Sequence, residues 1–533
     1  MSKEQQSEQT VWLPNKPSNS SLQMPNHKDD KDLKDTDESP GNTTETNKET
    51  QDEPPYTIFS NSDKWFILSL CTMAAMLSAI GAPIYYPALV IVQDYYHTSS
   101  EMANLAVVFY LLAQGISPTF FAGLADTYGR RPVMIVSLLI FIAANVIIPL
   151  VNSFTALLVL RIVQSAGISP TVALVNGVLG DITLRQERAG FVGISSGLVV
   201  SSQSYGSLLG AGLISGLGWR AIFWFLAIAG FVALTLITVF LPETQRAKVG
   251  NGSILPKSKI FSTSPIFSIG FFKKRWHIDQ PDMDTLSEAP AKVDFTAGFK
   301  ILLVPDLAIM LLNQGLQFSL FTITLTTLTT QLSKTYHYPI IKIGLCYLPP
   351  GFGGLLGAIT SGKLNDWNYR RQMTKFQAGK ENGTIPQDKK FDIIRARLQL
   401  GIPANIICDL FGIMFGWCIY YEKHIATINV SSFWICFFAM FITANVSTLL
   451  VDLYPSKGSG ATSIMNFVRC TLGALFVAVL DKMDQKMNIG GTLTFISAIC
   501  MVSNASLLYP ILFGMKNAQK REAAMAQSAI DKS

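Results

Sequence analysis

A cluster of charges between two long apolar runs is the strongest chemical signal in the chain. Asp126 precedes Arg130 and Arg131 by four and five residues, and Gly123 and Gly129 bracket the aspartate. A carboxylate is unfavourable at the negative, carboxyl end of a helix unless a cation lies near it, and the arginines can supply that cation. The glycines allow close backbone contact. The pattern therefore predicts a turn that packs tightly in one conformation and separates in another. Arginines that only fixed the topology would require neither the aspartate nor the glycines.

The same spacing recurs in the second half of the chain. Asp366 precedes Arg370 and Arg371 by four and five residues. A second echo joins Asp181 with Asp452, each of which lies eight residues before a pair made of one alanine and one glycine. Chance similarity between turns is the alternative. Because both echoes fall at corresponding junctions, we interpret them as an internal repeat of two parallel bundles, which places a substrate site near the midplane between them.

Three ionisable residues lie inside apolar runs: Arg161, Asp409 and Arg469. A charge at the centre of a spanning helix costs about 2.5 to 3.5 kcal/mol on insertion scales, so each needs an internal partner or a cavity. Asp409 could titrate, but we favour a neutral, hydrogen-bonded core acid. Arg469 could pair with Asp409, Asp452 or a substrate anion. Asp181, Asp409 and Asp452 are candidates for proton coupling, because a carboxylate can take up and release a proton.

The seventh apolar run carries the clearest substrate-binding pattern. It places Asn313, Gln314 and Gln317 at helical spacing, followed by Phe318 and Phe321. Amides beside aromatic rings suit a partly apolar ligand, cationic or neutral. The full set of substrate-binding candidates is Asn313, Gln314, Gln317, Phe318, Phe321, Tyr347 and Arg469. A small-residue stripe in the fifth run, which predicts close helix packing, contains Gly193, Gly197, Gly206 and Gly210.

Enzyme chemistry is not indicated. The sequence has no Gly-x-x-x-x-Gly-Lys-Ser/Thr phosphate loop, and its five histidines do not form a metal set. No local pattern brings a nucleophile, a base and an orienting acid together. We therefore expect no catalytic residues, no metal and no cofactor, with a proton gradient as the energy source. The net charge of +6 averages an acidic amino terminus with basic loops and implies no nucleic-acid partner.

These residues must be positioned by membrane-spanning helices. Hydrophobic residues make up 49% of the chain and charged residues 15%, which leaves too little polar surface for a soluble globule of 533 residues. Apolar runs of about 20 residues suit a lipid bilayer. The twelve predicted spans are 65–85, 102–122, 132–150, 155–178, 189–215, 219–241, 305–329, 341–364, 397–420, 428–451, 460–480 and 491–513.

The connections between spans predict the domain organisation and the orientation. About two dozen Lys and Arg residues lie in loops on one side of the membrane, so both termini are expected to be cytoplasmic. Residues 1–63 form a disordered acidic tail, 64–242 the first six-helix bundle, 243–304 a linker, 305–515 the second bundle and 516–533 a tail. The second bundle carries a flexible insertion at 365–396. The fold class is an all-α membrane protein with twelve transmembrane helices in two six-helix bundles.

The charged turn resembles the signature of the major facilitator superfamily, Gly-x-Leu-x-Asp-x-x-Gly-Arg-Arg/Lys. Leu157, Arg161, Gln164 and Gly167 match the family's fourth-span pattern, and the resemblance makes Arg161 a further candidate for proton coupling. Leu241-Pro242-Glu243-Thr244 resembles a sixth-span ending of the family's drug:H+ antiporters. The motifs at 218–226 and 344–349 are similar to the fungal quinidine-resistance exporters. One departure concerns the fifth span, where Ser207 replaces the proline of the antiporter signature.

The resemblance implies a secondary active exporter of amphiphilic drugs, or of amino acids or organic acids, in exchange for protons across a fungal plasma membrane. Its partners would be a small-molecule substrate, protons and the lipid bilayer, and we expect a monomer. Ser207 leaves uniport or symport open in place of antiport. A non-transporting nutrient or ion sensor on the same scaffold is the alternative from a different class.

Overall fold

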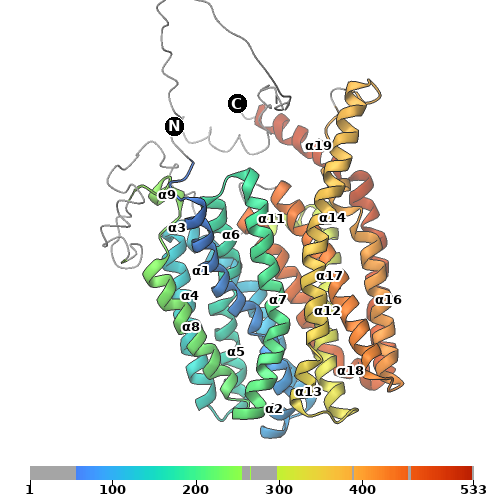
Figure 1. The fold of residues 1–533 in the computed structure, drawn as a ribbon. Coiled ribbons are helices and arrows are strands. Elements are labelled where there is room, and N and C mark those ends of the chain that lie inside the picture. The colour runs from blue at the N-terminus through green and yellow to red at the C-terminus, as the bar shows by residue number, and fades with distance from the viewer. Residues whose placement is uncertain (1–55, 255–264, 266–296, 387–388, 454–457, 531–533) are drawn as a thin grey trace, which may run out of the picture. The chain divides into compact units, whose positions relative to one another are not determined.

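The structure is a computed structural model that describes residues 56–254, 265, 297–386, 389–453 and 458–530. Every regular element in these ranges is a helix, and the long helices run side by side (Figure 1). Residues 56–518 form one compact unit that contains all of the predicted spans. The predicted tail at 1–63 and linker at 243–304 fall largely outside the described residues.

The first half of the chain supplies ten helical elements. They are α1 (Asn61–Ile80), η1 (Pro83–Ala88), α2 (Leu89–Tyr95), α3 (Ser100–Tyr128), α4 (Arg130–Ile147), η2 (Ile148–Leu150), α5 (Phe154–Ile168), α6 (Pro170–Ile182), α7 (Arg185–Leu217) and α8 (Ala221–Phe240).

The segment between the halves contains the short helix α9 (Arg246–Val249). The elements that follow it are α11 (Ala297–Leu302), α12 (Pro305–Lys334), α13 (Ile340–Leu345), α14 (Leu348–Glu381), α15 (Ile393–Leu398), α16 (Gly401–Tyr420), α17 (Ile425–Leu453), α18 (Gly458–Ser506) and α19 (Leu508–Ile530).

Ten stretches of the described residues are long and apolar enough to cross a membrane. The last of them, Gly460–Arg521, has 62 residues and is too long for one crossing. Asn488, with φ +59°, is a non-helical residue that divides it within α18. The 33-residue helix α7 is an additional helix of spanning length. The all-α membrane fold predicted from the apolar runs is therefore confirmed, and the described residues contain twelve helical stretches that match the twelve predicted spans.

Local sequence explains where these helices begin and end. The Ser60 side chain accepts a hydrogen bond from the Asp63 N–H, and the Asp63 carboxylate accepts one from the Ser60 N–H, which caps α1. Ser99 caps α3 in the same manner through the Met102 N–H. Gly129 separates α3 from α4 with φ +106°, a backbone conformation that favours glycine.

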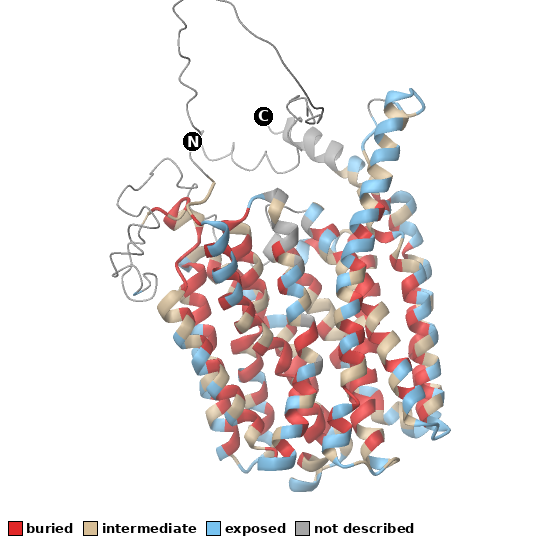
Figure 2. Ribbon diagram, viewed as in Figure 1, coloured by how far each residue is buried: buried red, intermediate tan, exposed pale blue. Residues whose placement is uncertain are grey.

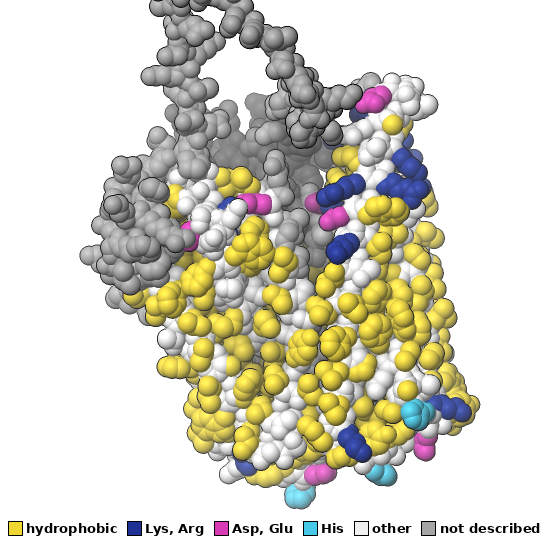
Figure 3. Space-filling model, viewed as in Figure 1, with side chains coloured by type: hydrophobic (Ala, Val, Ile, Leu, Met, Phe, Trp, Pro, Cys, Tyr) yellow, Lys and Arg dark blue, Asp and Glu magenta, His cyan; other side chains and the backbone are white. Residues whose placement is uncertain are grey.

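The two halves of the chain are in direct contact through the helices that border them. Within the first half α1 packs on α7 and α3 on α5, and within the second half α12 packs on α18 and α14 on α17. Across the boundary, α3 packs on α18 and α7 on α14. Buried residues follow the inward faces of the helices and exposed ones the outer faces (Figure 2). Hydrophobic side chains cover the middle of the visible surface, and charged ones gather at its two ends (Figure 3).

The eighth span differs from its prediction in two respects. The expected flexible insertion from residue 365 is instead a continuation of α14 as far as Glu381. The predicted span at 341–364 is also not one continuous helix, and Pro349 lies in the first turn of its second part, α14, where proline is tolerated. The interruption lies at Cys346 and Tyr347, between α13 and α14. Further along α14, a Cβ on Gly353 or Gly357 would overlap a backbone carbonyl oxygen of α17, that of Phe433 or Phe437.

Candidate functional site

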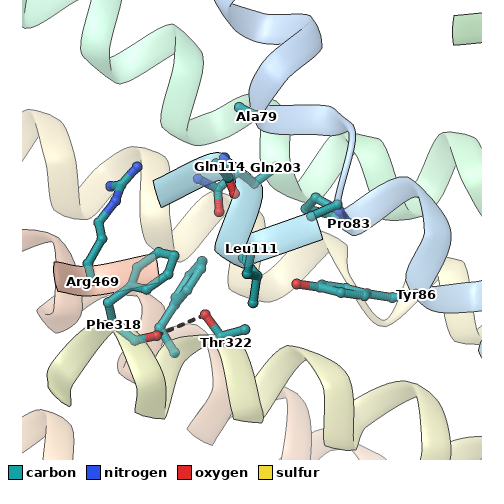
Figure 4. Close-up of a pocket in the computed structure, with 11 residues that line it drawn as sticks. Ala79, Pro83, Tyr86, Leu111, Gln114, Gln203, Phe318, Thr322 and Arg469 are labelled. Atoms are coloured by element: carbon teal, nitrogen blue, oxygen red, sulfur yellow. Dashed lines mark hydrogen bonds between the residues drawn. The ribbon is translucent and has the colours of Figure 1, made fainter. Parts of the chain in front are cut away.

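A cavity lies between the two halves of the chain and takes its walls from both. Figure 4 shows Arg469 and Phe318 on one side of the drawn residues and Tyr86 on the other, with Leu111 and Gln114 between them. Its lining residues come from α1, η1, α3 and α7 in the first half and from α12 and α18 in the second. They are Ala79, Ala82, Pro83, Tyr86, Leu111, Gln114, Gln203, Phe318, Phe321, Thr322 and Arg469.

Arg469 is the charged residue among those that line the cavity, and none of the eleven is acidic. Its Nε donates to Asn466 Oδ1 at 2.9 Å, and its guanidinium carbon lies 4.9 Å from the centre of the Phe318 ring. Asn466 in turn donates to the backbone oxygen of Gln114 at 2.6 Å, which joins α18 to α3. A cation over an aromatic ring, with amides nearby, suits a partly apolar ligand that carries an acceptor or a negative charge.

The cluster predicted on the seventh span is divided between the two faces of α12. Phe318 and Phe321 stack on each other, with ring centres 5.9 Å apart, and both line the cavity. Asn313 and Gln317 instead contact α16 and α18 and are not among the residues that line the cavity. The spacing could not distinguish these faces, because every face of α12 in the bundle is apolar or uncharged.

Two other substrate-binding candidates are buried outside the cavity lining. Gln314 lies one helical turn before Phe318 and therefore on its face of α12. Both side-chain atoms of its amide lack a hydrogen-bond partner among the described residues. The Tyr347 hydroxyl donates to the backbone oxygen of Leu325 at 2.6 Å and is fully buried, which gives it a packing role.

Asp409 is fully buried at the back of α12, away from the cavity. Its Oδ1 accepts a hydrogen bond from Gln317 Nε2 at 2.9 Å, and its Oδ2 accepts one from Asn504 Nδ2 at 2.7 Å. Asn504 Oδ1 accepts from both Asn313 and Asn405, each at 2.9 Å. Arg469 contacts neither Asp409 nor Asp452 among the described interactions, so these two predicted pairings are not observed.

Arg161 is fully buried in the first half, where two tyrosine rings enclose it. Its guanidinium carbon lies 4.3 Å from the Tyr85 ring centre and 4.6 Å from that of Tyr110. Nη1 donates to the backbone oxygen of Gly81 at 3.2 Å and to Gln164 Oε1 at 2.9 Å. Nε and Nη2 have no hydrogen-bond partner in the described part of the chain. The structure thus contains the expected carbonyl contact but leaves two donors of this cation available.

The charged turn brings together the residues that its spacing predicted. Arg130 Nη1 lies 2.5 Å from Asp126 Oδ1, and Arg130 Nε lies 3.2 Å from Asp181 Oδ2. Arg130 therefore joins Asp126 and Asp181, the first-half aspartates of the two repeated patterns, in one ion-pair network. Arg131 donates instead to the backbone oxygen of Thr238, at 2.5 Å, on α8. Gly123 lies within α3, where its carbonyl accepts from the Thr127 hydroxyl.

Glu243 is a central residue of this turn that the sequence pattern did not single out. Its carboxylate accepts hydrogen bonds from the backbone N–H groups of Arg130, Arg131, Thr244 and Gln245. A Cβ on residue 129 would overlap the Glu243 carboxylate, which gives Gly129 a second reason to be glycine. The signal that could have found Glu243 is its position directly after the sixth span, where it can reach the exposed N–H groups of a helix start.

In the second half of the chain, Asp366 and Asp452 share one cation, Arg397. Asp366 lies 3.3 Å from Arg397 Nη1, and Asp452 Oδ2 lies 3.0 Å from Arg397 Nη2. Arg370 and Arg371 are exposed on α14, and Arg371 lies over the Trp367 ring. Among the described contacts, Asp366 therefore pairs with Arg397 and not with Arg370 or Arg371, although its spacing from them repeats that of Asp126. Because α14 continues past residue 366 without a turn, the cation comes from α15 instead.

Polar contacts between the halves gather at the helix ends opposite Asp126. We call these the Lys334 end and the Asp126 end. Asn104 Nδ2 donates to Asp481 Oδ2 at 2.9 Å, and Lys334 Nζ donates to the Ser100 hydroxyl at 2.8 Å. Lys482 adds an ion pair of 3.6 Å with Glu101. These contacts hold α3 against α12 and α18 at that end of the bundle.

The small-residue stripe of α7 is used at two of its four positions. A Cβ on Gly210 would overlap the backbone oxygen of Ile84, and one on Gly206 would press on Ile80, which explains the close approach of α7 to α1 and η1. Gly197 has open space beside it, and the surroundings of Gly193 lie outside the described residues. Ser207, which replaces a proline of the antiporter signature, donates to the backbone oxygen of Pro83 at 3.0 Å.

Comparisons with known proteins agree on one family. The family model of the Major Facilitator Superfamily matches residues 71–478. The probable transporter AQR1 of Saccharomyces cerevisiae is 41% identical over 87% of this chain and 79% of its own length. The MFS antiporter QDR2 of Candida albicans is 39% identical over 89% of this chain and 92% of its own. A crystal structure of the human organic anion transporter MFSD10 has a TM-score of 0.55 at 14% identity, covering 85% of this chain and all of that one, so it shares the fold.

Proposed function

Because the chain belongs to the major facilitator superfamily, we propose that it exports small organic compounds by alternating access. The observation that carries the proposal is the cavity, whose walls come from both halves of the chain. Movement of the halves against each other would open this cavity at one end and close it at the other. Polar contacts at the Lys334 end hold the halves together in the present conformation.

The driving force in this proposal is the proton gradient, and the membrane is the plasma membrane. Relatives that carry the names multidrug transporter and MFS antiporter support export in exchange for another solute. The excess of basic residues in loops at the Asp126 end supports a cytoplasmic location for that end and for both termini. We propose that the protein works as a monomer, since each half-cavity is completed by the other half of the same chain.

The chemistry of the cavity favours neutral or anionic amphiphiles as cargo. Phe318, Phe321 and Tyr86 offer aromatic surface, while Arg469 offers a positive charge with no acidic residue in the lining. A permanently cationic ligand would meet a like charge at Arg469, which costs affinity in a desolvated site. Arg469 therefore favours a second cargo class beside amphiphilic drugs, namely carboxylates with an apolar body.

Purified protein in liposomes with an imposed pH gradient tests the proposal. Quinidine and benzoate represent the two cargo classes, and each is measured with and without a protonophore. Gradient-dependent movement that the protonophore abolishes would support proton-coupled export. Flux of equal size with and without the pH gradient would indicate uniport in place of exchange. If neither compound moved, the export proposal would be overturned and a sensor function favoured.

Arg469→Ala separates the two cargo classes in the same assay. Benzoate flux should fall about tenfold or more, because a hydrogen-bonded charge partner is lost. Quinidine, which is cationic at neutral pH, should keep its flux or gain some, because the substitution removes a like charge from the cavity. Arg395→Ala, which removes an exposed arginine from α15, is the matched control and should leave both fluxes unchanged. Equal loss of both fluxes in Arg469→Ala would contradict a role in substrate selection.

A further inference from the structure

The polar network around Asp409 is separate from the cavity and from both charged turns. It joins α12, α16 and α18 through the side chains of Asn313, Gln317, Asn405, Asp409 and Asn504. All five side chains are at most 2% exposed. A fully enclosed network of this size is not needed to pack three apolar helices, because apolar side chains of the same volume would serve.

Two buried acceptors of the network have no hydrogen-bond donor. Asn405 Oδ1 and Gln317 Oε1 are buried acceptors with no hydrogen-bond partner among the described residues. Asp409 receives two amide N–H bonds, although an ionised carboxylate can accept about four. One added hydrogen on the Asp409 carboxyl would supply a donor within this group of acceptors. A protonated carboxyl donates one O–H while it keeps accepting, so it fits the network better than the carboxylate does.

The charges around Asp409 also favour the neutral acid. The groups that act on it are the amides of Gln317 on α12 and Asn504 on α18. The titratable side chains near it are two thiols, Cys408 on the same helix and Cys500 on α18. No lysine, arginine or histidine pairs with Asp409 in the described part of the chain. An unpaired carboxylate is far more costly to bury than a neutral carboxyl.

We propose that Asp409 is a proton-binding site, which carries its proton sealed from solvent in this conformation and exchanges it when α12 moves. The link to the cavity is the sequence Gln317-Phe318: Gln317 donates to Asp409 on one face of α12, and Phe318 lines the cavity on another. A displacement of Phe318 by cargo therefore acts on a helix that also holds a donor to Asp409. This inference rests on the proposed export function and assigns its coupled proton to the second half of the chain.

Infrared spectroscopy of the purified protein in lipid tests the site without requiring transport. A protonated carboxyl has a C=O stretching band that a carboxylate lacks. At neutral pH we expect one component of this band to disappear in Asp409→Asn, while Asp94→Asn, which removes an exposed acid from α2, leaves the band unchanged. Asp409→Glu keeps a carboxyl at the site and should shift that component rather than remove it. If Asp409→Asn does not fold, this shift still shows whether the component comes from residue 409.

An unchanged band in Asp409→Asn would overturn the proposal. It would equally be overturned if the wild-type band lacked this component and Na⁺ or K⁺ raised the unfolding temperature of wild type but not of Asp409→Asn, because the site would then bind a metal cation.

Transport measurements test whether the proton at Asp409 is the coupled one. In Asp409→Asn, exchange of labelled cargo between equal pools should continue, while accumulation against a gradient under an imposed pH difference falls to none. Accumulation that persists in this variant would overturn the coupling. If wild-type protein moves no cargo at all, the export proposal fails, and the infrared result still decides whether Asp409 holds a proton.

Discussion

The carboxylate of Glu243 accepts a hydrogen bond from the backbone N–H of Arg130 at 2.9 Å, so the segment that follows α8 caps the start of α4. Gly129, the residue at the cap position, has no side chain that could do this. A second bond from the Arg131 N–H, at 3.3 Å, completes the cap. The charged turn after α3 is thus held by a residue more than a hundred positions away, as well as by its own ion pairs.

Glu243→Ala should destabilise the turn, because buried N–H groups lose their acceptor. We expect the free energy of unfolding to fall by about 1–3 kcal/mol, with a parallel loss of flux. Thermal unfolding in detergent and flux in liposomes measure the two effects. Glu381→Ala, at the exposed end of α14, is the control. If Glu243→Ala matches the control in both measurements, the cap does not stabilise the turn.

Arg397 should matter more than either arginine that the spacing singled out. Arg397→Ala leaves Asp366 and Asp452 as neighbouring carboxylates without their shared cation. Since both acids are partly exposed, we expect about 1 kcal/mol of destabilisation together with a reduced rate of transport. Arg370→Ala, from exposed α14, should change neither quantity. If Arg370→Ala lowered the unfolding temperature and the flux more than Arg397→Ala did, Arg397 would not be the important partner of these acids.

A covalent bond across the Lys334 end should stop transport. Asn104 and Asp481 are joined by a side-chain hydrogen bond of 2.9 Å between α3 and α18, which makes them the pair to replace with cysteines. Oxidised Asn104→Cys/Asp481→Cys should lose flux about tenfold or more, because the halves can no longer separate there. Reductant should restore it, and each single variant should ignore the oxidant. Full flux in a verified cross-linked sample would show that this end does not open.

Asp452 gives the ion pair at Arg397 a pH dependence. Burial raises the pKa of Asp452 above its ordinary value, and the attraction of Arg397 offsets only part of that rise. Between the ordinary value of about 3.9 and the raised one, the folded protein binds more protons than the unfolded chain, so stability falls as pH rises through this window. Relative to Asp452→Asn, the wild type should therefore gain unfolding temperature on acidification. A difference between the two proteins that stays constant with pH would exclude this titration.

Much of the fold follows directly from the sequence, because spanning helices are specified by local apolar length. The pairing of Asp126 with Arg130 is equally local, since residues four apart meet on a helix or across its end. The unpredicted features depend on contacts between distant segments. Nothing in the spacing of Asp366, Arg370 and Arg371 could reveal that α14 continues and that Arg397 of the next helix replaces them.

The seventh span illustrates the same limit within a single helix. Asn313 and Gln317 are fully buried, but burial does not tell which neighbour a residue faces. The middle of α12, residues 313–329, is surrounded by other helices. Its sequence therefore has no exposed polar face from which the direction of each buried face could be inferred. Only the positions of α16 and α18 separate the amides from the aromatic rings.

The two glycines of α14 that lie against the Phe433 and Phe437 carbonyls have a mechanical consequence. With no side chain between the backbones, α14 and α17 touch directly and cannot slide past each other without collision. Their motion must then be shared, and the bending that it requires has to occur where the chain is not helical. Cys346 and Tyr347, which separate α13 from α14 at the Lys334 end, are where we expect that bending.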